Sequence, residues 1–393
     1  MTIYLQHLGL VCALGRGVST VRNALLNSDG PGGLTPSDRY SPGRELHLGE
    51  VTGPLPDLGH VAPEFRVRNN ALALTALSEM RPAVDAAISR FGPKRVAIVV
   101  GTSTSGLPEG EAARRQWVHT RTWPEGYSYA KQELGNVAGY LAAELGVTGV
   151  SHVISTACSS GAKALASGAR LLRAGLADAV VAGGCDALGA FTVAGFSALE
   201  SVSAARCNPL SLNRRGINLG EGAALFLMSR DEGPVKLAGW GESSDAHHMS
   251  APDPSGRGAM QAMHLALQRA GISPQELDYV NLHGTATHHN DAMESLAVAE
   301  VLGAQVAVSS TKPLTGHTLA AAGAIEAAFA WLTLVDNPSG ALPPHWWDGQ
   351  VDPALPALKV VAAGEQLGRA PRYVLSNSFA FGGSNATLLL GCA

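Results

Sequence analysis

The sequence predicts an α/β fold whose elements occur in two similar series, and three features support this prediction. Short apolar runs rich in Val, Ile and Ala alternate with longer segments whose apolar residues recur at helical spacing. Strands that are apolar throughout are typical of parallel sheets with helices on both faces. One unit, a strand followed by Ser-Thr, a turn and an Ala-rich helix, occurs at 154–174 and again at 308–330. We therefore expect two α/β halves, 1–232 and 233–393.

The first half is expected to contain strands at 3–14, 95–101, 150–154, 178–183 and 223–228, and helices at 15–27, 69–91, 127–145 and 161–173. Pro82 should interrupt or kink the second of these helices, because proline lacks a backbone donor. Residues 28–62 are rich in Gly, Pro and Asp and are expected to form a surface excursion. Residues 200–222 are expected to be loop-like.

The second half repeats this alternation. Strands are expected at 235–239, 278–282, 306–309, 373–376 and 387–390, and helices at 258–270, 291–302 and 317–335. A Pro-rich loop continues from the last helix to about residue 356.

The bulk composition excludes several classes of protein. Only 15% of the residues are charged and 46 are glycine, which indicates a tightly packed interior and a buried subunit interface. The net charge of −4 argues against nucleic acid as a partner. No signal peptide or membrane span is predicted. The five cysteines, at 12, 158, 185, 207 and 392, fit neither a disulfide framework nor a zinc pattern, so we expect a cytoplasmic protein.

Cys158 is the first candidate for chemistry. It follows a short strand and precedes an Ala/Leu-rich helix, in a turn of small residues. Unpaired N–H groups and the dipole at a helix start favour negative charge, so we expect a stabilised thiolate that acts as a nucleophile. A buried, unreactive cysteine is the alternative, and the turn alone does not decide between them.

Two further clusters lie at the ends of predicted strands, where open α/β sheets place their sites. The first contains His283, and the second contains Lys312 and His317. Taken singly, each has an ordinary structural interpretation: a hydrogen-bonded histidine, a surface lysine, a helix cap. Together with Cys158, two imidazoles and a lysine suit thioester chemistry, in which the thiolate takes an acyl group and N–H donors stabilise an oxyanion or enolate.

Four motifs then identify a family. They are STACSSG around Cys158, LHGTAT at His283, SSTKPLTGH through His317, and SNSFAFGGSN at 376–385. From about residue 9 to 390, their order and spacing resemble those of the β-ketoacyl-acyl carrier protein synthases of type I/II. The resemblance implies a thiolase-like fold, a duplicated five-layered α/β/α/β/α sandwich. It also implies dimers formed across the strand that precedes the nucleophile.

The resemblance assigns a role to each matching residue. Cys158 would accept the acyl chain from acyl carrier protein. His283 and His317 would hydrogen-bond the thioester carbonyl of malonyl-acyl carrier protein and stabilise the enolate left after decarboxylation. That carbanion would attack the acyl thioester. The backbone N–H groups of Cys158 and Phe381 would form the oxyanion hole, with Phe381 also acting as a gate.

Lys312 and Glu326 match the charged pair that organises the histidines, although Glu326 alone could be a surface charge. Thr285 and Thr287 match positions that hydrogen-bond the phosphopantetheine arm. The implied chemistry needs no metal and no cofactor beyond this arm of the carrier. The ligand-like run from His288 to Asp291 lacks a metal-site spacing.

Relatives and other classes make different predictions. Type III synthases pair one His with an Asn, and thiolases use a second cysteine in a C-terminal motif, which Cys392 does not match. A chain-length-factor-like subunit that shapes the pocket of a heterodimer is the main alternative, although such subunits have lost the nucleophile. A cysteine hydrolase would need a nucleophile, a His and an orienting acid, which two histidines and a lysine fit poorly.

Some positions depart from the family pattern. Ala380 stands where Gly is usual before the gating Phe381, and we expect its methyl to restrict the loop. His288 replaces a usual Pro, and 214–217 reads RRGI where RDGF is usual. These differences favour a specialised synthase, for example of polyene or other secondary metabolism. Because acyl carrier protein is acidic, a basic patch is expected at the pocket mouth, with three candidates: Arg66, Arg68 and Arg206.

Overall fold

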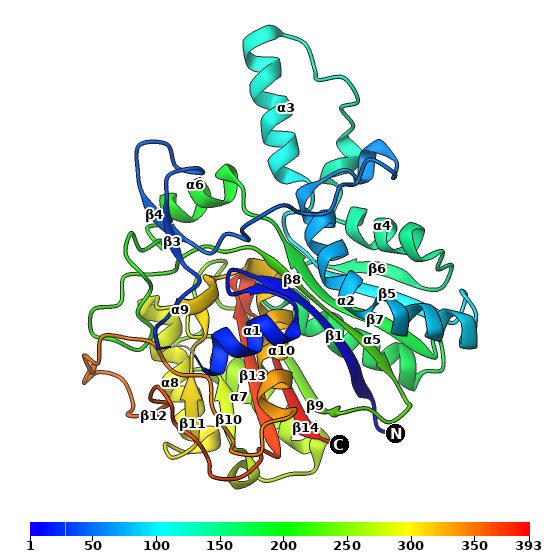
Figure 1. Cartoon of the computed structure of the whole chain (residues 1–393). Helices are drawn as coiled ribbons and strands as arrows, with labels where there is room; N and C mark the ends of the chain where they lie inside the picture. Colours follow the sequence, from blue (N-terminus) through cyan, green and yellow to red (C-terminus); the bar gives the residue numbers. More distant parts are fainter. Residues whose placement is uncertain (28) are drawn as a thin grey trace.

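The computed structural model describes residues 1–27 and 29–393 (Figure 1). Its strands are β1 Tyr4–Cys12, β2 Gly15–Arg16, β3 Thr35–Ser37, β4 Leu46–Leu48, β5 Val96–Gly101, β6 Ser151–Ile154, β7 Ala179–Asp186, β8 Gly222–Ser229, β9 Val235–Ser244, β10 Tyr279–Asn281, β11 Ala307–Ser309, β12 Lys359–Val360, β13 Tyr373–Ala380 and β14 Ser384–Cys392. Its α-helices are α1 Val18–Leu26, α2 Arg68–Phe91, α3 Leu107–Thr120, α4 Asn136–Leu145, α5 Ser160–Arg173, α6 Ala190–Ala198, α7 Arg257–Ala270, α8 His288–Leu302, α9 Lys312–Thr315 and α10 Ala322–Leu334.

The strand pairing follows the same pattern in both halves of the chain. In the first, β8 runs antiparallel to β1 and β7, while β7, β5 and β6 are mutually parallel neighbours. In the second, β14 runs antiparallel to β9 and β13, while β13, β10 and β11 are parallel neighbours. The two series join where β1 pairs with β9. Strand β6 ends the sheet at the opposite edge from β12.

Five layers result from the helices that cover this sheet. Helices α2 and α4 pack on the outer face of the first series of strands, and α7 and α8 on that of the second. Helices α5 and α10 lie between the two series. All thirteen residues of α10 are buried, Glu326 among them, and the rest of the helix is almost entirely apolar. The α/β/α/β/α arrangement expected from the resemblance is therefore present.

Small residues allow the two central helices to approach closely. A Cβ added to Gly161 of α5 would lie 2.8 Å from the backbone N of Ala324. A Cβ added to Gly323 of α10 would lie 2.9 Å from the backbone N of Ala162. This contact positions the start of α5, which directly follows Cys158.

The structure corrects several predicted elements. The segment after residue 28 is not only a surface excursion, since β4 buries Leu46 and Leu48 completely; Ser28 itself lies outside the described residues. Helix α2 continues through Pro82 without a break. The helix expected at 127–145 is a 3₁₀ turn at Tyr129–Gln132 followed by α4.

Three helices were not predicted: α3, α6 and the four-residue α9. Helix α3 has little apolar periodicity because it projects from the body of the molecule and buries only Ala113 (Figure 1). Helix α6 likewise buries only Val193. Among the described residues, no helix combines the length and apolar character needed to cross a membrane.

Candidate active site

Cys158 lies in a tight turn between β6 and α5. Ala157 adopts a positive φ of 51°, and Ser160 closes the turn by accepting a hydrogen bond from the Thr156 N–H and donating one to the Ala157 carbonyl. The side chain of Cys158 is buried, with 5% of its surface exposed. The turn therefore holds the thiol at the centre of the molecule, where the central helices meet.

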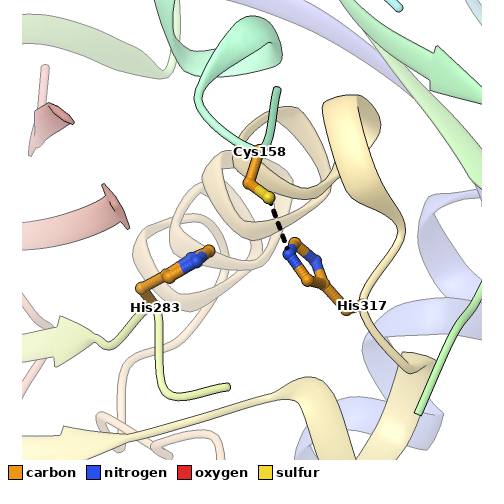
Figure 2. Close-up of side chains that lie close together, drawn as sticks. All are labelled: Cys158, His283 and His317. Atoms are coloured by element: carbon orange, nitrogen blue, oxygen red, sulfur yellow. Dashed lines mark hydrogen bonds between the residues drawn. The ribbon is translucent and has the colours of Figure 1, made fainter. Parts of the chain in front are cut away.

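The structure brings both predicted histidines to this thiol. His283 follows β10 and His317 follows α9, and both are 2% exposed. Figure 2 shows the two rings on either side of Cys158, whose Sγ lies 2.9 Å from Nε2 of His317. The rings are nearly perpendicular, with centroids 5.3 Å apart, and one side-chain ligand atom from each of the three residues lies within 4.8 Å of the other two.

His317 lies outside the helix that was expected to begin with it. The chain turns at Gly316 and again at Leu319, both with positive φ, and α10 starts only at Ala322. If His317 were in the first turn of a helix, its imidazole would lie against the helix surface. In the observed loop, the ring of His317 faces the thiol instead.

Burial determines the charge states at this site. It raises the pKa of Cys158 to about 11, against the lowering effect of the nearby Lys312 cation and of backbone N–H groups from Phe381 and Cys158. Burial and the Lys312 cation also lower the pKa of His283 and of His317 well below the usual range. In the resting site, desolvation therefore outweighs the expected stabilisation of the thiolate by backbone N–H groups.

A buried ion pair lies behind His283. Nζ of Lys312 is 2.5 Å from Oε1 of Glu326, and both side chains are almost completely buried. Burial raises the pKa of Glu326 to about 7. Nζ of Lys312 also donates to the backbone carbonyl of His283 and lies 3.4 Å from its Nδ1.

This contact determines which nitrogen of His283 carries a proton. Because an ammonium group can only donate, Nδ1 of His283 is the acceptor and the ring proton is held on Nε2. Nδ1 of His317, by contrast, has no hydrogen-bond partner among the described residues, so only the contact of its Nε2 with the Cys158 thiol bears on its tautomer.

Two cavities meet at Cys158, and Phe196 and Phe381 also line both of them. The first is lined by the two histidines together with Thr285 and Thr287. The second is mostly apolar and extends along α6. The rings of Phe196 and Phe381 pack at a centroid distance of 5.7 Å, so they form the partition between the cavities.

The structure also tests the departures from the family motifs. Ala380 has φ −101° and ψ 156°, an extended conformation that alanine adopts without strain, so its methyl does not restrict the loop through φ as expected. Its side chain instead forms part of the wall of the first cavity. The hydroxyls of Thr285 and Thr287 lie 2.9 Å apart at the same cavity.

The three arginines considered for carrier docking have structural partners. Arg68 forms an ion pair with the buried Glu221, and the guanidinium group of Arg206 donates to several backbone carbonyls, among them that of Gly32. Arg66 donates to the carbonyls of Val61 and Gly59. The ion pair neutralises Arg68, whereas a docking role for Arg66 and Arg206 stays a prediction.

Metal ligation was not expected. Cys158, His283 and His317 form the one group of potential ligands that comes together among the described residues, and the run from His288 to Asp291 does not join them. A sulfur and two imidazoles suit soft metals. However, the buried Lys312 cation beside His283 opposes the binding of a second cation.

Sequence reasoning missed two buried carboxylates that position the site. Glu294 on α8 accepts hydrogen bonds from the N–H groups of His283 and Gly284, and burial raises its pKa to about 7. Asp186 accepts from Thr104 and from the Ala320 N–H, and so connects two walls of the apolar cavity. A charged residue inside an otherwise apolar strand or helix face was the available signal for each.

Comparisons with known proteins agree with this geometry. The family model for the N-terminal domain of β-ketoacyl synthase matches residues 68–233, and that for its C-terminal domain matches 235–345. A 3-oxoacyl-(acyl-carrier-protein) synthase 2 of Rhizobium meliloti is 36% identical over 274 residues, 64% of this chain. The chain spans 63% of the length of that relative.

Two further matches cover nearly the whole chain. A 3-oxoacyl-(acyl-carrier-protein) synthase 2 of Staphylococcus aureus is 28% identical over 412 residues, 98% of this chain and 97% of that protein. A solved structure of a ketosynthase in complex with its chain length factor, from Xenorhabdus doucetiae, matches with a TM-score of 0.94 and 43% identity. That match covers 100% of this chain and 98% of the other.

Proposed function

Because this chain belongs to the β-ketoacyl synthase family, with its thiolase-like fold, we propose that it elongates acyl chains by decarboxylative Claisen condensation. The observation that carries this proposal is the meeting of one thiol and two imidazoles at the junction of two cavities. An elongating enzyme needs a nucleophile that both an incoming carrier arm and a stored acyl chain can reach.

In the first step, Cys158 takes the acyl group. The resting thiol is neutral, so its proton must leave as sulfur attacks the thioester, and Nε2 of His317 is the acceptor at 2.9 Å. The imidazolium then returns this proton to the departing pantetheine thiolate. The N–H groups of Cys158 and Phe381 hold the negative oxygen of the tetrahedral intermediate.

In the second step, the malonyl thioester loses carbon dioxide. The Nε2–H of His283 donates to the enolate oxygen, since Lys312 keeps its Nδ1 unprotonated. His317 donates from the other side once Nε2 carries a proton, which its unpartnered Nδ1 permits. The carbanion attacks the acyl thioester, the new carbon–carbon bond forms, and Cys158 is the leaving group.

The two cavities suit the two substrates. The first cavity, with Thr285 and Thr287, would receive the phosphopantetheine arm, and the second, mostly apolar cavity would hold the growing chain. The arm belongs to acyl carrier protein, so we propose that the reaction uses no separate cofactor. Phe381, in the partition, would act as the gate.

We propose that the protein works as a dimer in the cytoplasm. Strand β6 leaves a free sheet edge that a second chain could extend, and the Xenorhabdus doucetiae ketosynthase is complexed with a chain length factor. Both a homodimer and a heterodimer are compatible with this edge. The assembled site with Cys158 favours the condensing subunit over a chain-length-factor-like role.

Two further proposals concern origin and pathway. The repeated pairing pattern supports duplicated halves at 1–232 and 233–393. The departures at Ala380 and His288 support a specialised synthase of polyene or polyketide type. A strong preference for ordinary saturated primers, in competition with unsaturated and aryl-primed carriers, would contradict the second of these proposals.

Intact-protein mass spectrometry tests the function. The protein is incubated with a panel of acyl carrier proteins and then chased with the malonyl carrier. The proposal expects an acyl adduct on Cys158 that disappears in the chase, with formation of a ketoacyl carrier two carbons longer. A Cys158→Ala variant is the matched control and should take up no acyl group. Uptake without condensation would instead indicate a hydrolase or transferase.

A further inference from the structure

A chain of side-chain hydrogen bonds runs behind Cys158. Nζ of Lys163, on α5, donates to Oγ of Ser384 at 2.6 Å, and Oγ of Ser384 lies 3.1 Å from Oγ of Ser159. Ser159 in turn donates to the Thr156 carbonyl at 2.8 Å. The Lys163 ammonium and the Ser159 hydroxyl both donate to Oγ of Ser384, so the two contacts meet at this hydroxyl.

This chain joins two segments that are far apart in the sequence. Thr156 and Ser159 flank Cys158, while Ser384 begins β14 directly after the 3₁₀ turn Phe381–Gly383. The backbone N–H groups of Cys158 and Phe381 both point toward the thiol. The N–H of Cys158 is thus one residue from Ser159, and the N–H of Phe381 is three residues from Ser384.

Packing restrains the two glycines of the Phe381 turn unequally. Gly382 and Gly383 both have positive φ; a Cβ added to Gly382 would meet no atom within 4 Å, whereas one added to Gly383 would lie 2.9 Å from Cβ of Asp245. On its other side, the turn is held by backbone hydrogen bonds to Met249 and Asp245. Met249 is 79% exposed, so those bonds connect the turn to a surface segment.

We propose that Lys163 is a positioning residue for the oxyanion hole. Through Ser384 and Ser159, it sets the distance between the N–H donors of Cys158 and Phe381. Two donors stabilise one oxyanion only when both lie about 2.7–3.1 Å from its position, so a small shift of either lowers the rate. The inference rests on the proposed acyl transfer, in which that oxyanion forms.

Single-turnover acyl transfer to Cys158 measures the effect. Lys163→Met keeps the length of the side chain and removes the donor, and we expect a fall of about 10- to 100-fold in the transfer rate with KM nearly unchanged. Lys163→Arg keeps a donor and should recover most of the rate. Ser384→Ala should lose as much as Lys163→Met, and the double variant should lose no more, because both changes break one chain.

Alkylation of Cys158 by iodoacetamide separates this role from a general structural one. Alkylation forms no oxyanion, so Lys163→Met should change its rate far less than the acyl-transfer rate. Arg170→Met, which removes a cation from the same helix, is the matched control and should leave both rates unchanged. Equal losses in both reactions, additive losses in the double variant, or an unchanged transfer rate would each overturn the inference.

Hydrogen exchange tests the tether independently of activity. Lys163→Met should speed amide exchange around 381–384 relative to the wild type, and Arg170→Met should not. If the wild type takes up no acyl group, the proposed function fails, while this measurement still decides whether Lys163 holds the turn. Unchanged exchange at 381–384 would refute the tether.

Discussion

Sγ of Cys158 lies 2.9 Å from Nε2 of His317, and both side chains are buried. Two such groups can form a thiolate–imidazolium pair or a neutral thiol–imidazole pair. Burial disfavours charge on both, raising the pKa of the thiol to about 11 and lowering that of the imidazole. The structure therefore indicates the neutral pair.

The first prediction is that the rate of Cys158 alkylation reaches no plateau near neutral pH. A raised pKa keeps the thiol protonated, so the thiolate fraction should increase about tenfold per pH unit up to about pH 11. The rate of alkylation by iodoacetamide, followed by peptide mass spectrometry from pH 6 to 10, should rise throughout. The exposed Cys392 is an internal reference for the reagent. A plateau at or below pH 7 would indicate the ion pair instead.

The second prediction concerns the buried Lys312–Glu326 pair. Lys312→Met should destabilise the protein by about 3–5 kcal/mol, because Glu326 is left buried without a cation. The folded-state pKa of Glu326, about 7, lies above its ordinary value of 4.5, and losing Lys312 raises it further. The folded state therefore binds this proton more tightly, and stability falls as pH rises between the two values.

Urea unfolding at pH 5 and pH 8 checks this sign. The loss in Lys312→Met should be larger at pH 8 than at pH 5. The double variant Lys312→Met/Glu326→Met should recover stability at pH 8, since two apolar side chains replace the pair, but it should not recover condensation. A larger loss at pH 5 would contradict the assignment.

The third prediction is that Glu294 positions His283. In Glu294→Gln, an amide NH₂ takes the place of one oxygen that accepts from the N–H groups of His283 and Gly284. We expect a loss of about 1–3 kcal/mol in unfolding free energy and slower malonyl decarboxylation. Glu300→Gln, on the exposed face of the same helix, is the control. Decarboxylation at the wild-type rate would show that Glu294 does not position His283 for this reaction.

The fourth prediction is that a larger side chain at position 195 limits the length of the acyl chain that the protein accepts. Gly195 lines the apolar cavity from α6, and an added Cβ would meet no atom within 4 Å. Gly195→Leu should therefore fold and should shorten the longest acyl group that loads onto Cys158. Gly195→Ala should stabilise the helix by about 0.5–1 kcal/mol. Gly139→Ala, exposed on α4, is a control for helix propensity alone. An unchanged chain-length limit in Gly195→Leu would place the growing chain elsewhere.

Much of the site was predictable because its motifs are local. The turn at Cys158 follows from a run of small residues between a strand and a helix, and His283 and Lys312 each follow a short apolar strand. Family resemblance then supplied the expectation that they meet. The order of elements followed from apolar periodicity, which failed for α3 and α6 because those helices bury almost nothing.

The sequence by itself thus determined the fold class, most of the order of the elements and the residues of the four motifs in the candidate site. Only the tertiary structure decided their charge states, because desolvation of Cys158 depends on every segment packed around it. It also decided that His317 lies in a loop, that Glu294 accepts a hydrogen bond from the N–H of His283, and that Lys163 contacts Ser384. These contacts join residues that are distant in the chain, and no local pattern encodes the distance between them.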